Sequence, residues 1–94
     1  MGTITFWVCI LVSPTRETVV KLTSDMRQLL GSIPAGTLLC YFRIYNDMQE
    51  ALGHKLFIEN ISDAERRHII KTMNPKGIDL SGIYVEKSYK INNN

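Results

Sequence analysis

Few side chains of this 94-residue chain have the types and spacing that catalysis requires, and His68 comes first among them. A neutral imidazole accepts a proton near pH 7, so His68 is the candidate general base or hydrogen-bond donor of a pocket. The competing interpretation is a histidine on a helix surface or a satisfied core histidine. No other residues stand at a spacing that would complete a catalytic constellation with His68.

Aromatic side chains form the second group of candidates. Trp7, Tyr41, Tyr45 and Phe57 can hold a planar substrate, although packing in a core or interface is the usual role of such residues. Arg43 and Glu59 can pair across neighbouring strands, and a structural ion pair is the simpler interpretation of these two.

The sequence predicts neither a metal site nor a cofactor. Cys9 and Cys40 lie inside apolar, strand-like runs rather than at metal-ligand spacing, so we expect two buried thiols that are not linked. No nucleotide-binding loop is present.

Hydrophobic periodicity predicts the elements that position these residues. Residues 3–12 are apolar on both faces, which is typical of a central strand covered twice. Ser13-Pro14 followed by apolar residues at helical spacing predicts a helix that ends at Gly31. Residues 37–45 alternate as a second strand.

The stretch from His54 to Thr72 organises the second half of the chain. Alternation over 56–61 predicts a third strand, and the sequence Ser62-Asp63-Ala64-Glu65 then fits a capping box that starts a helix. Asn74-Pro75 ends that helix, and residues 83–91 are predicted to be a fourth strand. Arg66, Arg67 and Lys71 are predicted to form a solvated helix face.

The predicted order is βαββαβ, which is the ferredoxin-like α+β arrangement in one domain, residues 1–94. It has a four-stranded antiparallel sheet, ordered 4-1-3-2, with two helices on one face. That order separates the strands of Cys9 and Cys40. The other sheet face would be uncovered yet apolar, so we expect a homodimer with the two sheets packed face to face.

Charge and hydropathy argue against two classes of partner, nucleic acids and membranes. The formal net charge is only +2, so nucleic acid is not an expected partner. The apolar run at 4–12 is too short to span a bilayer and has no signal-peptide flanks, so we expect no membrane association and a cytoplasmic protein.

The run from Pro34 to Thr72 resembles the antibiotic biosynthesis monooxygenase family. The family's Pro-Gly turn corresponds to Pro34 and Gly36 of this chain, and the family's Arg-x-Tyr-x-Asp segment corresponds to Arg43, Tyr45 and Asp47. Its Glu-Glu-Trp strand end corresponds to Glu59-Asn60-Ile61, so the family's tryptophan is absent. Its His-Leu-x-Ser helix corresponds to the segment that begins at His68.

This resemblance implies a dimeric α+β barrel and cofactor-independent oxygenation of a quinol or another small aromatic molecule. It makes His68 the catalytic residue. The candidate substrate-binding residues are then Trp7, Tyr41, Phe57 and Asn60. Haem degradation is disfavoured because the pocket tryptophan is missing.

Three functions therefore remain open. The first is the oxidoreductase just described, and the second is a non-catalytic dimeric module that binds a small molecule or a protein. The third is an RNA binder of the RNA-recognition-motif type, because the element order is the same and residues 53–58 loosely match its aromatic strand.

Overall fold

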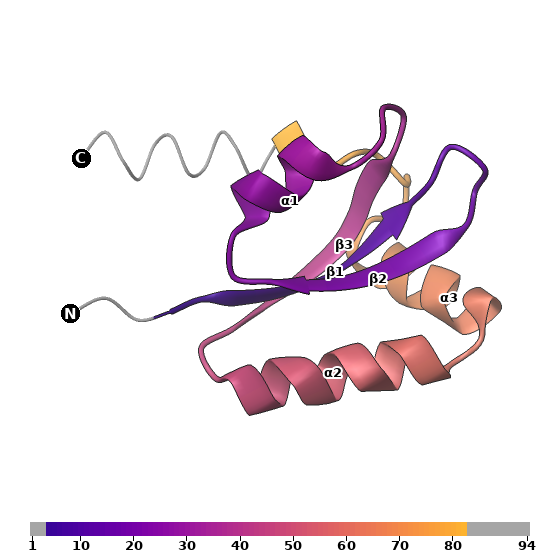
Figure 1. Cartoon of the computed structure of the whole chain (residues 1–94). Helices are drawn as coiled ribbons and strands as arrows, with labels where there is room; N and C mark the ends of the chain where they lie inside the picture. The colour runs from indigo at the N-terminus through magenta and orange to yellow at the C-terminus, as the bar shows by residue number, and fades with distance from the viewer. Residues whose placement is uncertain (1–3, 83–94) are drawn as a thin grey trace.

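Three antiparallel strands and three helices make up residues 4–82, the part of the chain that the structure, a computed structural model, describes (Figure 1). In chain order the elements are β1 (Phe6–Val12), β2 (Thr18–Thr23), α1 (Met26–Ser32), β3 (Leu38–Tyr45), α2 (Met48–Asn60) and α3 (Asp63–Met73). The α+β class is as predicted and compatible with a ferredoxin-like fold. The order of the described elements is ββαβαα rather than βαββαβ, and the predicted strand 83–91 lies outside the described residues.

The sheet has the order β2-β1-β3, with β1 in the centre as predicted. Alternate side chains of β1 enter two separate cores, because successive residues of a strand point to opposite faces. Val8 and Ile10 belong to one core and Cys9 and Leu11 to the other, and all four are buried. Each face of the sheet must therefore be covered.

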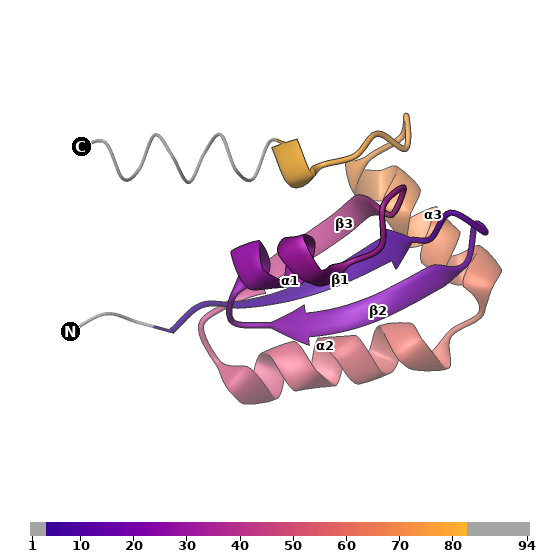
Figure 2. The ribbon, with the colours of Figure 1, turned by 45° about the horizontal axis from the view of Figure 1, so that its top comes forward.

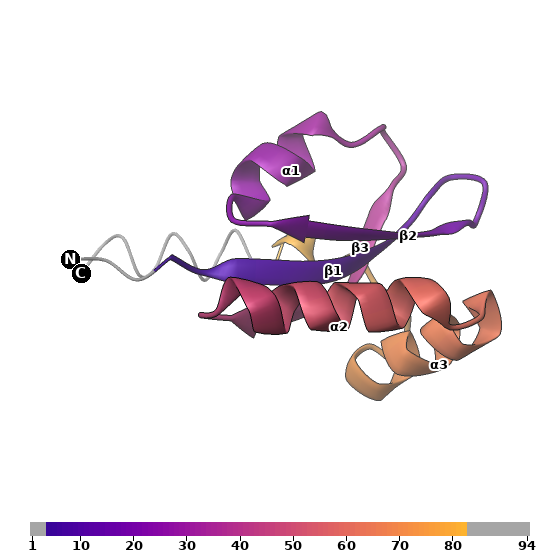
Figure 3. The same ribbon diagram turned by 60° about the horizontal axis from the view of Figure 1, so that its bottom comes forward.

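Helices of the same chain supply that cover on both faces. α2 and α3 lie on one side of the sheet and α1 lies on the other (Figure 2, Figure 3). Ala51, Ile58 and Ile70 close the first core, while Met26 and Leu80 close the second. The prediction that both helices share one face, and that the opposite face needs a second subunit, is therefore wrong for the described residues.

The predicted helix over 14–30 is also wrong in its first half, where the chain forms a hairpin and β2. Thr18, Val19 and Val20 are β-branched, so they favour an extended strand over a helix. The turn before β2 is closed by the Ser13 amide, which donates to the Glu17 carbonyl at 2.9 Å. The helix begins only after Asp25, whose carboxylate accepts from the Gln28 amide at 3.0 Å.

The predicted strand over 56–61 is wrong as well, since residues 56–60 form the end of α2 and Ile61 is its C-cap. Asp47 caps this helix by accepting from the Glu50 amide at 3.2 Å. The apolar run at 56–58 is short enough to fit either a strand or a buried helix turn. Ala51 and Ile58, seven residues apart, both reach the core, which is the spacing of one helix face.

The capping box of α3 is confirmed. The Ser62 hydroxyl accepts from the Glu65 amide at 3.1 Å, and the Glu65 carboxylate accepts from the Ser62 amide at 3.2 Å. Arg66, predicted to be solvated, instead holds the α2–α3 connection. Its guanidinium donates to the Ile61 carbonyl at 2.7 Å and to the Thr18 hydroxyl at 2.8 Å.

A β-bulge in β3 changes which side chains share a face. Ile10 pairs with Tyr41 and Leu11 with Leu39, so Cys40 is the extra residue. Cys40 and Tyr41 therefore both belong to the core beneath α2 and α3. The buried amide of Asn74 donates to the Cys40 carbonyl at 3.1 Å and thereby satisfies the backbone at the bulge.

The two cysteines are free, as predicted, but for a different reason. Their strands β1 and β3 are neighbours, whereas the predicted sheet order separated them. Cys9 and Cys40 belong to different cores on opposite faces of the sheet, so their sulfur atoms do not meet. Burial raises the pKa of the Cys9 thiol to about 12, which keeps it protonated and unreactive.

We predict that Asn74→Ala lowers the free energy of unfolding by about 2–4 kcal/mol, because it leaves polar backbone groups at the bulge and at Ile78 without partners. Urea unfolding followed by circular dichroism measures this loss. Asn60→Ala is the matched control, since the exposed Asn60 amide bonds only the Leu56 carbonyl, and it should change stability by less than about 0.5 kcal/mol. Equal losses in the two variants would contradict the assigned role of Asn74.

Candidate functional site

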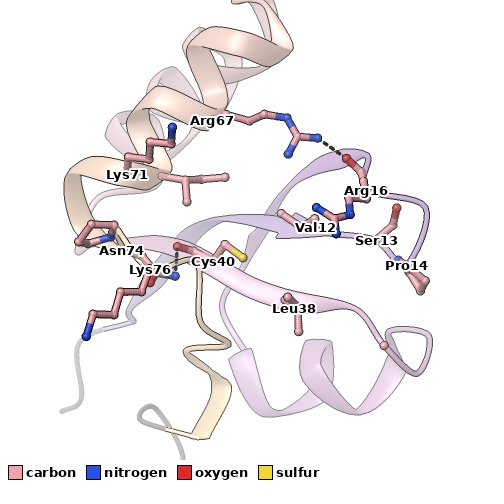
Figure 4. Close-up of a pocket in the computed structure, with 14 residues that line it drawn as sticks. Val12, Ser13, Pro14, Arg16, Leu38, Cys40, Arg67, Lys71, Asn74 and Lys76 are labelled. Atoms are coloured by element: carbon pink, nitrogen blue, oxygen red, sulfur yellow. Dashed lines mark hydrogen bonds between the residues drawn. The ribbon is translucent and has the colours of Figure 1, made fainter.

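A cleft of about 690 Å³ opens where the β1–β2 turn, the start of β3 and the C-terminal end of α3 meet (Figure 4). This volume lies within the range of small-molecule sites, about 300–1,000 Å³. Apolar side chains of Val12, Leu38 and Ile70 line it together with Cys40. Each of these residues comes from a strand or from α3, so the apolar part of the cleft is held by regular structure.

Four cationic side chains also line the cleft: Arg16, Arg67, Lys71 and Lys76. Among the described lining residues there is no aspartate or glutamate. Arg16 and Lys71 reach the cleft from opposite sides, whereas the Lys76 side chain points away from Arg16 (Figure 4). The described lining of the cleft therefore carries cationic groups and no anionic one, which favours a negatively charged ligand.

Arg67 differs from the other three cations because its guanidinium is already engaged. It donates to the Asp63 carboxylate at 2.6 Å and to the backbone carbonyl of Arg16. A hydrogen bond from Thr18, and next the pairing with Arg67, lower the pKa of Asp63, so this partner stays ionised. Arg67 therefore fixes α3 against the β1–β2 turn. From the sequence, Arg67 was predicted to lie on a solvated helix face.

The β1–β2 turn holds Arg16 in an unusual backbone conformation. Its φ is 72°, in the left-handed region that a residue other than glycine rarely adopts. The Arg16 amide donates to the Ser13 carbonyl at 2.8 Å, and its own carbonyl accepts from Arg67. These two bonds fix the Arg16 backbone beside the cleft that its side chain lines.

A second turn closes the cleft beside Pro14. Gly36 has a φ of 88°, and a Cβ atom built there would lie 3.2 Å from Pro14 Cγ. A side chain at this position would therefore be strained by its backbone and crowded by the proline. The glycine of the predicted Pro-Gly turn allows the two turns to meet.

The site residues predicted from the sequence do not gather around this cleft. Trp7 packs against the core that α1 covers, whereas Tyr41 is buried in the core beneath α2. One small ligand cannot contact both side chains, because the sheet separates them. His68 is exposed on α3, and Asn60 ends α2 with its amide donating to the Leu56 carbonyl at 2.7 Å.

Two of the predicted residues do come together. Phe57 and His68 line a second, open groove of about 380 Å³ between α2 and α3, with Ile61 and Ile69 beside them. Phe57 is 57% exposed, so this groove is shallow and solvated. Its apolar character is consistent with an aromatic contact surface, but the structure provides no lid over His68 among the described residues.

The sequence interpretation missed His54, which lies at the α2–β3 contact. Its Nε2 is 3.1 Å from the hydroxyl of the buried Tyr41, and its ring also lies near Tyr45 and Phe57. Burial, and next the positive charge of Arg43, lower the pKa of His54 and favour the neutral ring. Its spacing from Ala51 and Ile58 would have placed it on the buried helix face, had a helix been predicted.

Two other predictions from the sequence are wrong. Glu59 forms an ion pair with Lys55 at 3.1 Å on α2, and not with Arg43 across strands. Residues 53–58, which loosely matched the RNA-contacting strand of RNA-recognition motifs, are helical. The strand platform on which that RNA hypothesis depended is therefore not formed by this segment.

No group of three or more His, Cys, Asp or Glu side chains among residues 4–82 is arranged to hold a metal ion. Within the same residues, no helix has the length and apolar character needed to cross a membrane. Comparison of the chain with protein-family models, with curated protein sequences and with solved structures gives no match.

We predict a pH-dependent contribution of His54 to stability. Because the pKa of His54 is lower in the folded chain than its ordinary value of 6.5, the unfolded chain takes up its proton first as the pH falls. The free energy of unfolding should therefore decrease as the pH drops below about 6.5. Urea titrations between pH 5 and 8 should give a flatter profile for His54→Gln than for the wild type. Superimposable profiles would contradict this assignment.

Proposed function

We propose that this protein is a non-catalytic binding module that takes a small anionic molecule in the cleft between the β1–β2 turn and α3. One observation carries the proposal: a cleft of small-molecule size has four cationic side chains in its lining, and two of them, Arg16 and Lys71, face it without an ion-pair partner among the described residues. Like charges in one cleft repel each other, and a bound anion removes that repulsion. Binding would therefore stabilise the fold by mass action.

Arg16 and Lys71 are the side chains that we assign to the anion. Neither has an ion-pair partner among the described residues, whereas Arg67 is engaged by Asp63 and by the Arg16 carbonyl. An arginine and a lysine on opposite sides of a cleft can donate to the same carboxylate or phosphate group.

We predict that benzoate binds and that benzamide, its neutral counterpart of similar shape, binds at least tenfold more weakly. Arg16→Gln and Lys71→Gln should each weaken benzoate binding about tenfold or more, because a hydrogen bond to a charged group contributes about 1.5–3 kcal/mol. Isothermal titration calorimetry at low ionic strength measures both effects, and added salt should reduce the affinity.

Arg27→Gln is the matched control for charge, since Arg27 is exposed on α1, on the opposite side of the sheet from α3. It should leave benzoate affinity unchanged. Equal affinity for benzoate and benzamide, or equal affinity of all three variants and the wild type, would overturn the proposed function.

We further propose that the module is a homodimer, with α2 rather than the sheet as its contact surface. Met48, Leu52 and Leu56 follow one another at intervals of four residues and remain 47%, 40% and 47% exposed. The opposite side of α2 is also apolar and packs on the sheet. A helix that is apolar on both sides is typical of a position between two packing partners.

The prediction for the dimer is that light scattering at micromolar concentration returns twice the chain mass and that Leu52→Glu returns the single mass. A buried charge at a symmetric contact occurs twice, once from each subunit, and so destabilises the dimer strongly. Met73→Glu, at another apolar residue that is 46% exposed, is the control and should remain dimeric. A wild-type monomer at this concentration would exclude the dimer.

The oxygenase activity implied by the family resemblance is the second candidate. The observation that favours it is the groove in which His68 lies beside Phe57, Ile61 and Ile69. There a neutral imidazole can accept the proton of a hydroquinone bound on the apolar surface.

We predict for this candidate that the protein accelerates oxygen uptake with hydroquinones and that His68→Ala lowers the rate by about 10²–10⁴. An oxygen electrode measures both rates. Uptake at the uncatalysed rate would leave the binding module as the function.

A further inference from the structure

The polar groups at the base of the cleft are already satisfied by the protein itself. The Asn74 side-chain amide, 4% exposed, donates to the carbonyls of Cys40 and Ile78 at 3.1 and 2.7 Å. Its carbonyl oxygen accepts from the Ile78 amide at 3.1 Å. The described lining around Asn74 also includes the apolar side chains of Val12, Leu38 and Ile70 and the weakly polar thiol of Cys40.

A ligand that fills this cleft therefore meets two different environments. At the mouth, Arg16 and Lys71 offer charged donors, and at the base the surface offers no unused strong donor. A polar group of the ligand that reached the base would lose its water without gaining a partner, which costs free energy. An apolar group there would bury its surface against Val12, Leu38 and Ile70 and gain from the hydrophobic effect.

We infer that the ligand of this cleft is an amphipathic anion: one carboxylate or phosphate head at Arg16 and Lys71, joined to an unbranched or aromatic apolar body that lies on Val12, Leu38 and Ile70. This inference rests on the proposed function and specifies its ligand class. Inorganic phosphate, sugars and the polar part of a nucleotide do not match the base of the cleft.

The test is the affinity of a series of straight-chain carboxylates from acetate to octanoate, at concentrations below micelle formation, with octanol and inorganic phosphate as comparisons. Each buried methylene should raise affinity about fourfold until the cleft is filled. Octanoate should therefore bind at least tenfold more tightly than acetate or inorganic phosphate. Octanol, which keeps the chain but lacks the charge, should bind at least tenfold more weakly than octanoate.

Separate variants test where the alkyl chain of the ligand binds and where its carboxylate head binds. Val12→Thr keeps the shape of the side chain but adds a hydroxyl, so it should weaken octanoate severalfold and leave acetate unchanged. Leu38→Thr provides a second variant of the base should Val12→Thr fail to fold. Lys71→Gln should weaken acetate and octanoate by the same factor, because both share the head. In the wild type, octanoate should shift the amide resonances of Gly36 and Gly77, two glycines that line the cleft.

Phe57→Ser is the control for the other apolar surface, the groove between α2 and α3. It should leave octanoate affinity unchanged. If this variant abolishes octanoate binding while Val12→Thr does not, the alkyl chain of octanoate lies in that groove and the inference is overturned.

The remaining outcomes separate this inference from the proposed function. Affinity that does not rise from acetate to octanoate, with binding still lost in Lys71→Gln, would overturn the amphipathic ligand and keep the anion site. Octanol that binds as tightly as octanoate, or no binding of any compound, would overturn both.

Discussion

The hydrogen bond from the Asn74 amide to the Cys40 carbonyl is the interaction on which much of this structure depends. Asn74 follows the last turn of α3, where its backbone amide also donates to the Ile70 carbonyl at 2.8 Å. One residue therefore ends a helix, satisfies a bulged strand and fixes the loop to Ile78. Because a bulge leaves part of a strand's backbone unpaired, it requires such a partner when it is buried. The bulge in turn directs Cys40 to the cleft and Tyr41 to His54.

The first and third strands and the last helix could be predicted from the sequence, because each has one dominant local signal. The residues of β1 are apolar on both faces, those of β3 alternate, and Ser62 and Glu65 form a capping box. The hairpin before β2 and the helix α2 could not be predicted in this way. In both segments the apolar residues fit the period of a helix and also that of a strand. Contacts with the rest of the polypeptide then decide between helix and strand. The short-range signals there, β-branching at 18–20 and the cap at Asp47, were weaker than the apparent pattern.

The candidate site shows a different limit of sequence interpretation. Arg16 and Lys71 are 55 positions apart by their numbers, and neither belongs to a motif. They meet at one cleft because the fold brings the β1–β2 turn to α3, where Arg67 donates to the carbonyl of Arg16. His68, the most evident candidate by residue type, lies on the same helix but faces the groove beside α2. Residue type alone could not distinguish the two sides of α3, since this requires the position of the helix on the sheet.

The left-handed backbone at Arg16 has a consequence for how this position is maintained over evolution. A glycine would adopt a φ of 72° without strain, whereas an arginine adopts it at a cost of about 1 kcal/mol. A sequence selected for stability alone would therefore be expected to drift towards glycine here. In this chain the position carries an arginine instead, at some expense of stability. If the Arg16 side chain serves the proposed anion site, related chains that use the cleft are expected to carry arginine here, and chains that have lost it to carry glycine or asparagine.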